Sequence, residues 1–423
     1  MHENKNDLLS SLLFILYLAF LTSLIFSFRA ISSISIPFIL ITGIIKNRIE
    51  EKTFFNAGLK HPFVIACTLF FLAQFISLVY TTNAHQAWRN IFLKSCLVAV
   101  PGAVFCCNYL DKITRKKILK WYCLILFAAC LVAISHALYV YSNNHNYSVF
   151  LYHSLVMIYS GHAIQFSVLV FVALVYLFEL LKEKDIFLNR YVHFCLIAFL
   201  LVFLFLLSSK LVISFFILYF LFFTIRSLVL HAATKKIAYA LGIAFIILSS
   251  IVLFTKNPIN NRFREIAQTD FNFINKEKYD PGLYFNGLQF RMLQWRFVPQ
   301  ILNEHKAWMT GMSVGDAQAD LNQKYIESRM YVGSPERGDK GFIGYNTHNE
   351  FLESLLQTGI PGLILFVLIT WALLKMVWER KTTGLSFVTI LLILYSFDES
   401  VLETQYSILI FLFFPSFFYH EKI

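Results

Sequence analysis

Residues Leu8–Phe28, which read LLSSLLFILYLAFLTSLIFSF, decide the fold class of this 423-residue chain. The run is apolar apart from scattered hydroxyl groups, and it is as long as the ~20 residues that an α-helix needs to cross a bilayer. It is too long for the core of a signal peptide, and it lacks a small-residue cleavage site. We therefore expect it to be a retained first membrane helix.

The whole chain has the composition of a membrane protein. Hydrophobic residues make up 58% of it and charged residues 14%, whereas soluble domains are about 45–50% apolar and about 25% charged. The sequence predicts an all-α polytopic membrane protein with about twelve transmembrane helices. The predicted spans are roughly 8–28, 31–45, 62–80, 91–109, 118–140, 160–181, 191–208, 210–226, 236–254, 360–377, 384–398 and 404–419.

Lysine and arginine residues, which give the chain a net charge of +11, concentrate in every second loop between these spans. Cytoplasmic loops carry such cations, so we expect both termini in the cytoplasm and the long loop on the outer face, the periplasm in a bacterial inner membrane. The domains are then 1–254 with helices 1–9, 255–358 as a periplasmic loop domain, and 359–423 with helices 10–12. The positive charge reflects topology, and we expect no nucleic-acid partner.

A few cations are predicted at the outer face against this bias: Arg29, Arg89, Lys94 and Lys210. Such a side chain either snorkels from a helix end to the lipid headgroups or has a function. Snorkelling is the simpler interpretation for Arg29. Both interpretations stay open for Arg89 and Lys210, because each is nearly alone in a short loop.

The loop 255–358 is too long for a simple connection and predicts a folded element. Within it, Phe290, Leu293, Phe297 and Ile301 recur at helical spacing, which predicts an amphipathic helix. Its two arginines, Arg291 and Arg296, lie about 140° apart around the helix axis, so we expect them to have different roles. A glycine-punctuated turn at 311–315, a helix over about 316–330 and a glycine-rich stretch at 333–344 follow.

The loop ends in a motif centred on His348. Thr347 and Glu350 have the spacing of a capping box, which predicts that His348 takes the first helical position. The positive end of the helix dipole would keep its imidazole neutral, and a neutral imidazole can act as a general base. The alternative is a histidine that only hydrogen-bonds in a loop. Gly359 is placed to end this helix, and Pro361 to begin the next one.

Other polar groups near the outer ends of the spans keep two interpretations. The acidic residues Asp398, Glu399 and Glu403 form either a solvated turn or a group that orients an arginine or contacts an acceptor. His153 and His162 either line a cavity or lie at the membrane interface. The seven cysteines lie in or beside apolar spans, so we expect no structural disulfide, and no Cys/His spacing predicts a metal site.

The string His348-Asn349-Glu350-Phe351-Leu352, with Gly359 and Gly362 after it and a long outer loop before it, resembles the O-antigen ligase and polymerase superfamily. Arg291 to Trp295, followed by Gly311 and Gly315, is also similar to that family. The resemblance implies a membrane glycosyltransferase of the GT-C type, metal-independent, inverting and without a cofactor. It implies a glycan donor on undecaprenyl diphosphate, in the setting of membrane lipids.

The resemblance also implies roles for individual residues. His348 would be the catalytic base, and Arg291, Arg89 and Lys210 would bind the diphosphate. The family usually has a Ser-Arg pair where this chain has Ser209-Lys210, and lysine loses the bidentate geometry of arginine. Candidate supporting residues are Arg296, Asn349, Glu350 and Glu399.

Three acceptors are compatible with these motifs. A ligase transfers the glycan to the lipid A-core oligosaccharide, a polymerase to another lipid-linked repeat, and a protein O-oligosaccharyltransferase to Ser or Thr. One compact loop with one histidine motif favours the ligase. A polymerase would more often have two sizeable arginine-rich outer loops, and here the loop at 141–160 has no Lys or Arg. A lipid-linked glycan flippase is disfavoured, because the hydropathy shows no two-fold repeat and the single long loop is asymmetric.

Overall fold

The computed structural model describes residues 2–50, 53–55, 57–106, 110–159, 162–183, 185, 189–230, 260, 264, 269, 271–283, 285–334, 336 and 338–420. In these residues the fold is all-α, and the β-structure described is an isolated bridge between Ser334 and Asp339. The helices are α1 (His2–Ile25), α2 (Arg29–Glu50), α3 (Pro62–Ile76), α4 (Ala84–Lys94), α5 (Cys96–Pro101), α6 (Lys112–Asn144), α7 (Tyr152–Leu155), α8 (Ala163–Glu183), α9 (Arg190–Leu206), α10 (Lys210–Leu230), α13 (Gly287–Glu304), α14 (Ala317–Glu327), α15 (Glu350–Arg380), α16 (Thr383–Asp398) and α17 (Gln405–His420).

The membrane fold class is confirmed. The predicted spans fall on helical residues, except that 236–254 lies outside the described residues. The predicted span 91–109 is divided between the end of α4 and α5, and its last three residues also lie outside the described residues. In the searched part of the chain, 7 helices are long and apolar enough to cross a membrane. The chain is therefore a multi-pass membrane protein.

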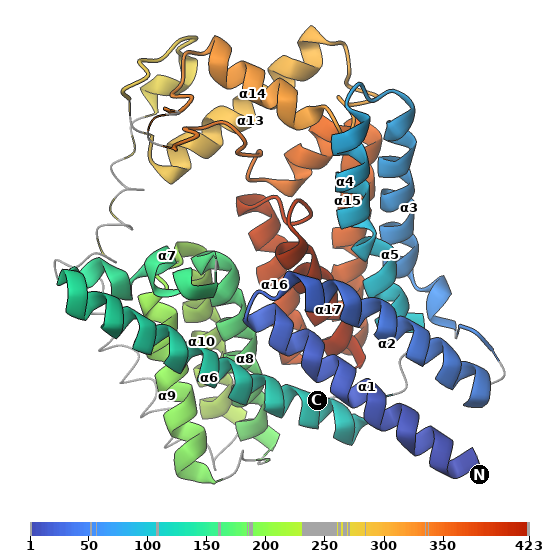
Figure 1. Cartoon of the computed structure of the whole chain (residues 1–423). Helices are drawn as coiled ribbons and strands as arrows, with labels where there is room; N and C mark the ends of the chain where they lie inside the picture. Colours follow the sequence, from blue (N-terminus) through green and yellow to red (C-terminus); the bar gives the residue numbers. More distant parts are fainter. Residues whose placement is uncertain are drawn as a thin grey trace.

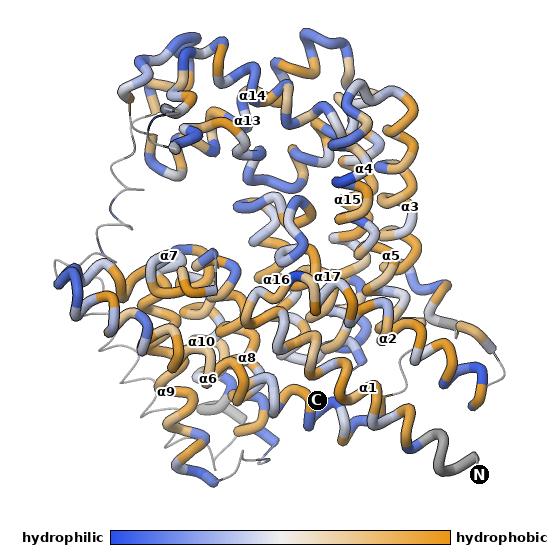
Figure 2. Tube along the Cα trace, viewed as in Figure 1, coloured by the Kyte–Doolittle hydropathy of each residue, from blue (hydrophilic) through white to orange (hydrophobic). Residues whose placement is uncertain are grey.

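Helix α8 is the buried centre of one half of the bundle. In its most apolar stretch 94% of the residues are buried, and it packs against α6, α9, α10 and α16. The other half is built by α1 with α2 and by α15 with α3 (Figure 1). The orange tubes of Figure 2 follow both halves, whereas the polar segments gather around α13 and α14, above the bundle in this view.

Large apolar side chains remain on the outside of the bundle. Ile15 is 60% exposed, Ile34 57% and Val79 87%. A soluble protein rarely exposes such a surface over a large area, but a lipid-facing helix must be apolar on the outside, because lipid tails surround it.

The polar loop forms a folded element with its own core. The predicted amphipathic helix is α13, and its apolar residues Phe290, Leu293, Phe297 and Ile301 are buried as expected. The same core includes Leu356 of α15, so the loop element packs on the beginning of a membrane helix.

Helix α15 changes direction at Gly359. This residue has a φ of +68°, and Thr358 before it is also non-helical. A Cβ atom on Gly359 would lie 2.6 Å from the carbonyl oxygen of Trp308, so the position requires glycine both for its dihedral angle and for close packing. The prediction that Gly359 ends one helix and Pro361 begins the next is thus confirmed. Before the kink, Leu352, Leu355 and Leu356 pack in the loop core. After it, Phe366 and Ile369 pack in the bundle core.

The glycine-punctuated turn connects the loop element to two membrane helices. The amides of Met312 and Ser313 donate to the carbonyls of Leu356 at 2.8 Å and Gln357 at 2.9 Å. Next to them, the carboxylate of Asp316 accepts hydrogen bonds from the amides of Thr82 at 2.8 Å and Asn83 at 3.0 Å, in the connection between α3 and α4. The loop element is therefore held to the bundle at both α15 and the α3–α4 connection.

Candidate functional site

His348 precedes α15 and is not its first residue, so the prediction from the capping-box spacing was wrong. The N-cap is Asn349, whose side-chain oxygen accepts from the amides of Phe351 at 3.0 Å and Leu352 at 3.2 Å. The expected cap, Thr347, is occupied elsewhere, because its hydroxyl donates to the carboxylate of Glu353 at 2.8 Å. His348 therefore owes its properties to side-chain neighbours and not to a position inside the helix.

The backbone of His348 is held in an uncommon conformation. Its φ is +47°, in the left-handed region that costs a non-glycine residue about 1–3 kcal/mol. Both flanking residues are fixed: the indole of Trp295 donates to the carbonyl of Thr347 at 3.1 Å, and the amide of Asn349 donates to the hydroxyl of Ser400 at 3.2 Å. The surrounding contacts thus hold His348 in this conformation.

The imidazole of His348 pairs with Glu399, the residue that follows α16. The distance from Nδ1 to Oε2 is 2.8 Å, and the two side chains are 18% and 13% exposed. A carboxylate at Nδ1 selects the tautomer that carries its proton there, which leaves Nε2 as the basic nitrogen. The arrangement has the geometry of a base oriented by a carboxylate.

Arg291 holds the other side of this carboxylate. Its Nη2 lies 2.9 Å from Oε1 of Glu399, and its Nε donates to the backbone carbonyl of Asp398 at 3.0 Å. Burial alone would raise the pKa of Glu399, but the hydrogen bond with His348 and the charges of His348 and Arg291 lower it to about 2. Glu399 is therefore an ionised, buried partner, and the interpretation of this segment as a solvated turn was wrong.

Arg296 lies on another side of α13, as predicted for two arginines with different roles. Its guanidinium donates to the carbonyl of Lys276 at 2.7 Å and also to that of Ile274. It fixes the chain before α13 and contributes no group to the His348 pair.

The remaining candidate supporting residues hold the connection between α16 and α17. The carboxylate of Glu350 accepts from the amide of Leu402 at 2.8 Å. The side chain of Asn349 donates to the carbonyl of Phe397 at 3.3 Å. Both therefore position the segment that carries Glu399.

Two cavities lie near this pair, and His162 lines both of them. The smaller has a volume of about 290 Å³ and contains the imidazole of His348. Its other lining residues are Tyr152, His162, Phe285, Gly287, Phe290, Arg291, Gly341, Phe342, Tyr345 and Glu399. Aromatic rings thus form much of the wall around the base.

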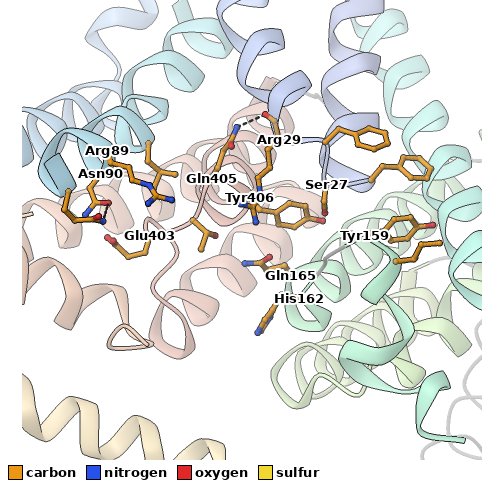
Figure 3. Close-up of a pocket in the computed structure, with 16 residues that line it drawn as sticks. Ser27, Arg29, Arg89, Asn90, Tyr159, His162, Gln165, Glu403, Gln405 and Tyr406 are labelled. Carbon is orange, nitrogen blue, oxygen red and sulfur yellow. Dashed lines mark hydrogen bonds between the residues drawn. The ribbon is translucent and has the colours of Figure 1, made fainter. Parts of the chain in front are cut away.

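The larger cavity has a volume of about 970 Å³ and lies between α2, α4, the start of α8 and the α16–α17 connection. Figure 3 shows Arg89 and Asn90 on one side of it, Ser27 and Tyr159 on the other, and Gln405 and Tyr406 between them. Arg29 and Arg89 both line it, and neither guanidinium has a carboxylate partner within the described residues. The cavity therefore offers uncompensated positive charge.

Lys94 and Lys210 are placed differently from the two arginines. Lys94 is fully buried and pairs with Glu403 at 2.8 Å, so its charge is compensated. Lys210 begins α10, where its charge interacts with Asp398, and it lines neither of the two cavities. Of the predicted diphosphate ligands, Arg89 alone lies in the large cavity, whereas Arg291 lies in the small one.

Arg29 lines the large cavity, although snorkelling was its simpler interpretation. Arg29, like Arg89, is a cation at the predicted outer face, where Lys and Arg are scarce. Its position at the end of a predicted helix, however, favoured a snorkelling side chain. Nothing in the sequence indicated that the α16–α17 connection would lie in the same cavity as Arg29 and Arg89.

Comparison with known families agrees with the motif. Residues 193–367 match the model of a family described as O-antigen ligase. The matched region includes Arg291 and His348, and the resemblance stated from the sequence is confirmed. No curated protein matches the chain.

Proposed function

Because residues 193–367 match the O-antigen ligase family model, we propose that the chain is an O-antigen ligase. In this proposal it transfers a glycan from undecaprenyl diphosphate to the lipid A-core oligosaccharide, at the periplasmic face of a bacterial inner membrane. The observation that carries the proposal is the contact between His348 and Glu399, in the wall of a small aromatic cavity that shares His162 with a large cationic one.

The His348–Glu399 pair supplies the base. Nε2 of His348 takes the proton of the acceptor hydroxyl while the oxygen forms its bond to the anomeric carbon. The bond from that carbon to the diphosphate breaks on the opposite face, and its electron pair stays on the diphosphate oxygen, which gives inversion. Glu399 stabilises the imidazolium that forms, and the reaction needs no metal ion.

The large cavity supplies the electrostatic part. A leaving diphosphate gains negative charge, and preorganised cations lower the barrier to that step. Arg29 and Arg89 meet this need, because their guanidiniums line the cavity without carboxylate partners in the described part of the chain. Arg291 shares its donors with Glu399, Asp398 and Gly287, so we assign it mainly to orienting the base.

The small cavity suits the acceptor. Sugar rings pack well against aromatic faces, and Phe290, Phe342 and Tyr345 lie beside His348 in its wall. Tyr345 lies 5.9 Å from His348 between ring centroids. A sugar held there would present a hydroxyl group to the base.

Replacement of His348 by glutamine tests the mechanism. We expect the H348Q protein to fold and to bind the donor, but to transfer glycan at a rate lower by at least about 10²–10⁴-fold, because the base is lost. The measurement is transfer from a lipid-linked donor by the purified protein. Transfer at a rate near that of the unchanged chain would refute the role of His348.

Gene deletion tests the acceptor class. A ligase leaves full-length lipid-linked polymer behind when it is removed, whereas loss of a polymerase leaves only single lipid-linked repeats. We expect the polymer. Single repeats would favour the polymerase, and an unprocessed glycan destined for protein would favour the protein O-oligosaccharyltransferase.

A further inference from the structure

His162 lines both cavities, and we call its position the junction of the two. It immediately precedes α8, and among the residues that line either cavity it alone lines both. Its Nδ1 is buried and has no hydrogen-bond partner in the described part of the chain. A ligand in either cavity would contact the edge of the ring that lines them, and not the buried Nδ1.

The neighbouring histidine has a different arrangement. Nδ1 of His153 accepts a hydrogen bond from the amide of Ala163 at 3.1 Å, which ties it to the start of α8. The rings of His153 and His162 meet edge to face, with their centroids 4.4 Å apart. His153 thus supports the fold and packs against His162, while the Nδ1 of His162 remains without a partner.

Charged groups face His162 from several elements. Glu399 and Asp398 interact with it from the end of α16, Arg291 from α13 and His348 from the segment before α15. Arg29, Arg89 and Glu403 line the large cavity with it. Burial lowers the pKa of His162, and the charges of His348 and Arg291 act in the same direction against those of Glu399 and Asp398. Without a bound anion, burial and these charges together therefore favour the neutral ring of His162.

We propose that His162 binds the donor's diphosphate at the junction of the two cavities, donating a hydrogen bond to the phosphate nearest the sugar. This inference rests on the proposed function. If the diphosphate lies with Arg29 and Arg89 and the acceptor lies with His348, the bond that breaks must lie at this junction. His162 is the residue at that place.

Donor binding would also change the protonation of His162. The negative charge of a diphosphate favours an imidazolium beside it, so the ring takes up a proton when the donor binds and donates a stronger, charge-assisted hydrogen bond. As the bond to the sugar breaks, this donor faces the oxygen that keeps the electron pair. No bond to His162 forms or breaks in the transfer itself.

The test compares His162→Gln and His162→Ala with the unchanged chain, using undecaprenyl diphosphate as the binding probe and undecaprenyl monophosphate for contrast. Glutamine keeps an N–H donor but cannot become charged. We expect H162Q to bind undecaprenyl diphosphate about 10-fold more weakly at pH 6 and with a smaller loss at pH 8, because a charge-assisted hydrogen bond is lost only where the imidazolium forms. H162A should weaken binding at both pH values.

Calorimetry in two buffers of different ionisation enthalpy gives the proton uptake directly. The unchanged chain should take up protons on binding the diphosphate, and H162Q should take up fewer. His145→Gln is the matched control, because His145 is an exposed histidine at the end of α6, away from both cavities. It should bind as the unchanged chain does.

The outcomes separate this inference from the proposed function. If the unchanged chain binds and transfers the donor while H162Q and H162A bind it equally well at both pH values, the role of His162 is refuted and the proposed function stands. If the unchanged chain itself does not bind undecaprenyl diphosphate, both are refuted. A loss in H162A with unaltered proton uptake in H162Q would also overturn the inference.

Discussion

At the scale of single residues, the site depends on one carboxylate shared by two cations. Glu399 binds His348 through Oε2 and Arg291 through Oε1, so each contact orients the other. An ionised carboxylate at Nδ1 makes the opposite nitrogen a better base and stabilises the imidazolium. Removing only the charge of Glu399 should therefore impair the chemical step more than binding.

The first prediction concerns Glu399→Gln. We expect turnover to fall on the order of 10²–10⁴-fold, as in triads whose carboxylate is replaced by its amide, while binding of the donor changes little because Glu399 lies outside the large cavity. Steady-state kinetics of the purified protein measure this. Glu304→Gln is the control, because Glu304 is 52% exposed and pairs with Lys324 on the loop element. A donor KM that rises while kcat stays constant would contradict the prediction.

The second prediction concerns stability against pH. The pKa of Glu399 in the folded chain, about 2, is below its ordinary value of 4.5, so its stabilising contribution is present above about pH 4.5 and is lost as the pH falls towards 2. The contribution is on the order of 3 kcal/mol at neutral pH. Thermal unfolding in detergent should show E399Q less stable at pH 7 and the difference shrinking at pH 3.5. A difference in stability between E399Q and the unchanged chain that stays the same at both pH values would contradict the prediction.

At the scale of elements, the sequence predicts apolar periodicity better than it predicts caps. The buried face of α13 follows from the spacing of Phe290, Leu293, Phe297 and Ile301, because periodicity is a property of the segment itself. The start of α15, in contrast, does not follow from the local sequence. Thr347 matches a capping pattern, yet its hydroxyl contacts Glu353 and Ser400, and the latter contact depends on a connection 53 residues away. A local pattern cannot reveal such a competitor.

The third prediction concerns the kink in α15. Gly359→Ala should destabilise the chain by more than about 2 kcal/mol, because the new Cβ would clash with the backbone of Trp308 and Met309 in addition to the strain of a positive φ. Gly338→Ala is the matched control: its φ is +62°, and nothing lies within 4 Å of the added atom. It should cost only the strain of a positive φ, about 1–2 kcal/mol. Equal losses in thermal unfolding would show that packing at the kink is unimportant.

At the scale of the whole molecule, the site is assembled from distant segments. Charge alternation between apolar runs indicated which loops share a side, so the sequence could place Arg29, Arg89 and the loop element together. It could not show that α16 would end beside α13, because that contact arises from the packing of helices. The pairing of Arg291 with Glu399 was therefore open from sequence, although an acidic group that orients an arginine was one of its alternatives.

Asp316 carries the last prediction, because it joins the loop element to the membrane bundle. Its carboxylate accepts from the amides of Thr82 and Asn83 and from the hydroxyl of Ser313 at 2.8 Å. Burial would raise the pKa of Asp316, but the hydrogen bonds from Thr82 and Ser313 lower it below its ordinary value of 3.8. The attachment is thus complete above about pH 4 and weakens as the pH falls below that.

Asp316→Ala should loosen this attachment without unfolding the bundle, because the amides of the α3–α4 connection lose their acceptor while the hydrogen bonds of Met312 and Ser313 to α15 remain. We expect faster proteolysis of the loop element and a several-fold loss of transfer, since His348 is on the loop side and Arg89 is on α4. Asp320→Ala, one turn further along α14, is the control, because Oδ2 of Asp320 is buried without a partner in the described residues. If both variants were cleaved and transferred glycan at the rates of the unchanged chain, the two cavities would be held in register by the α15 contacts alone.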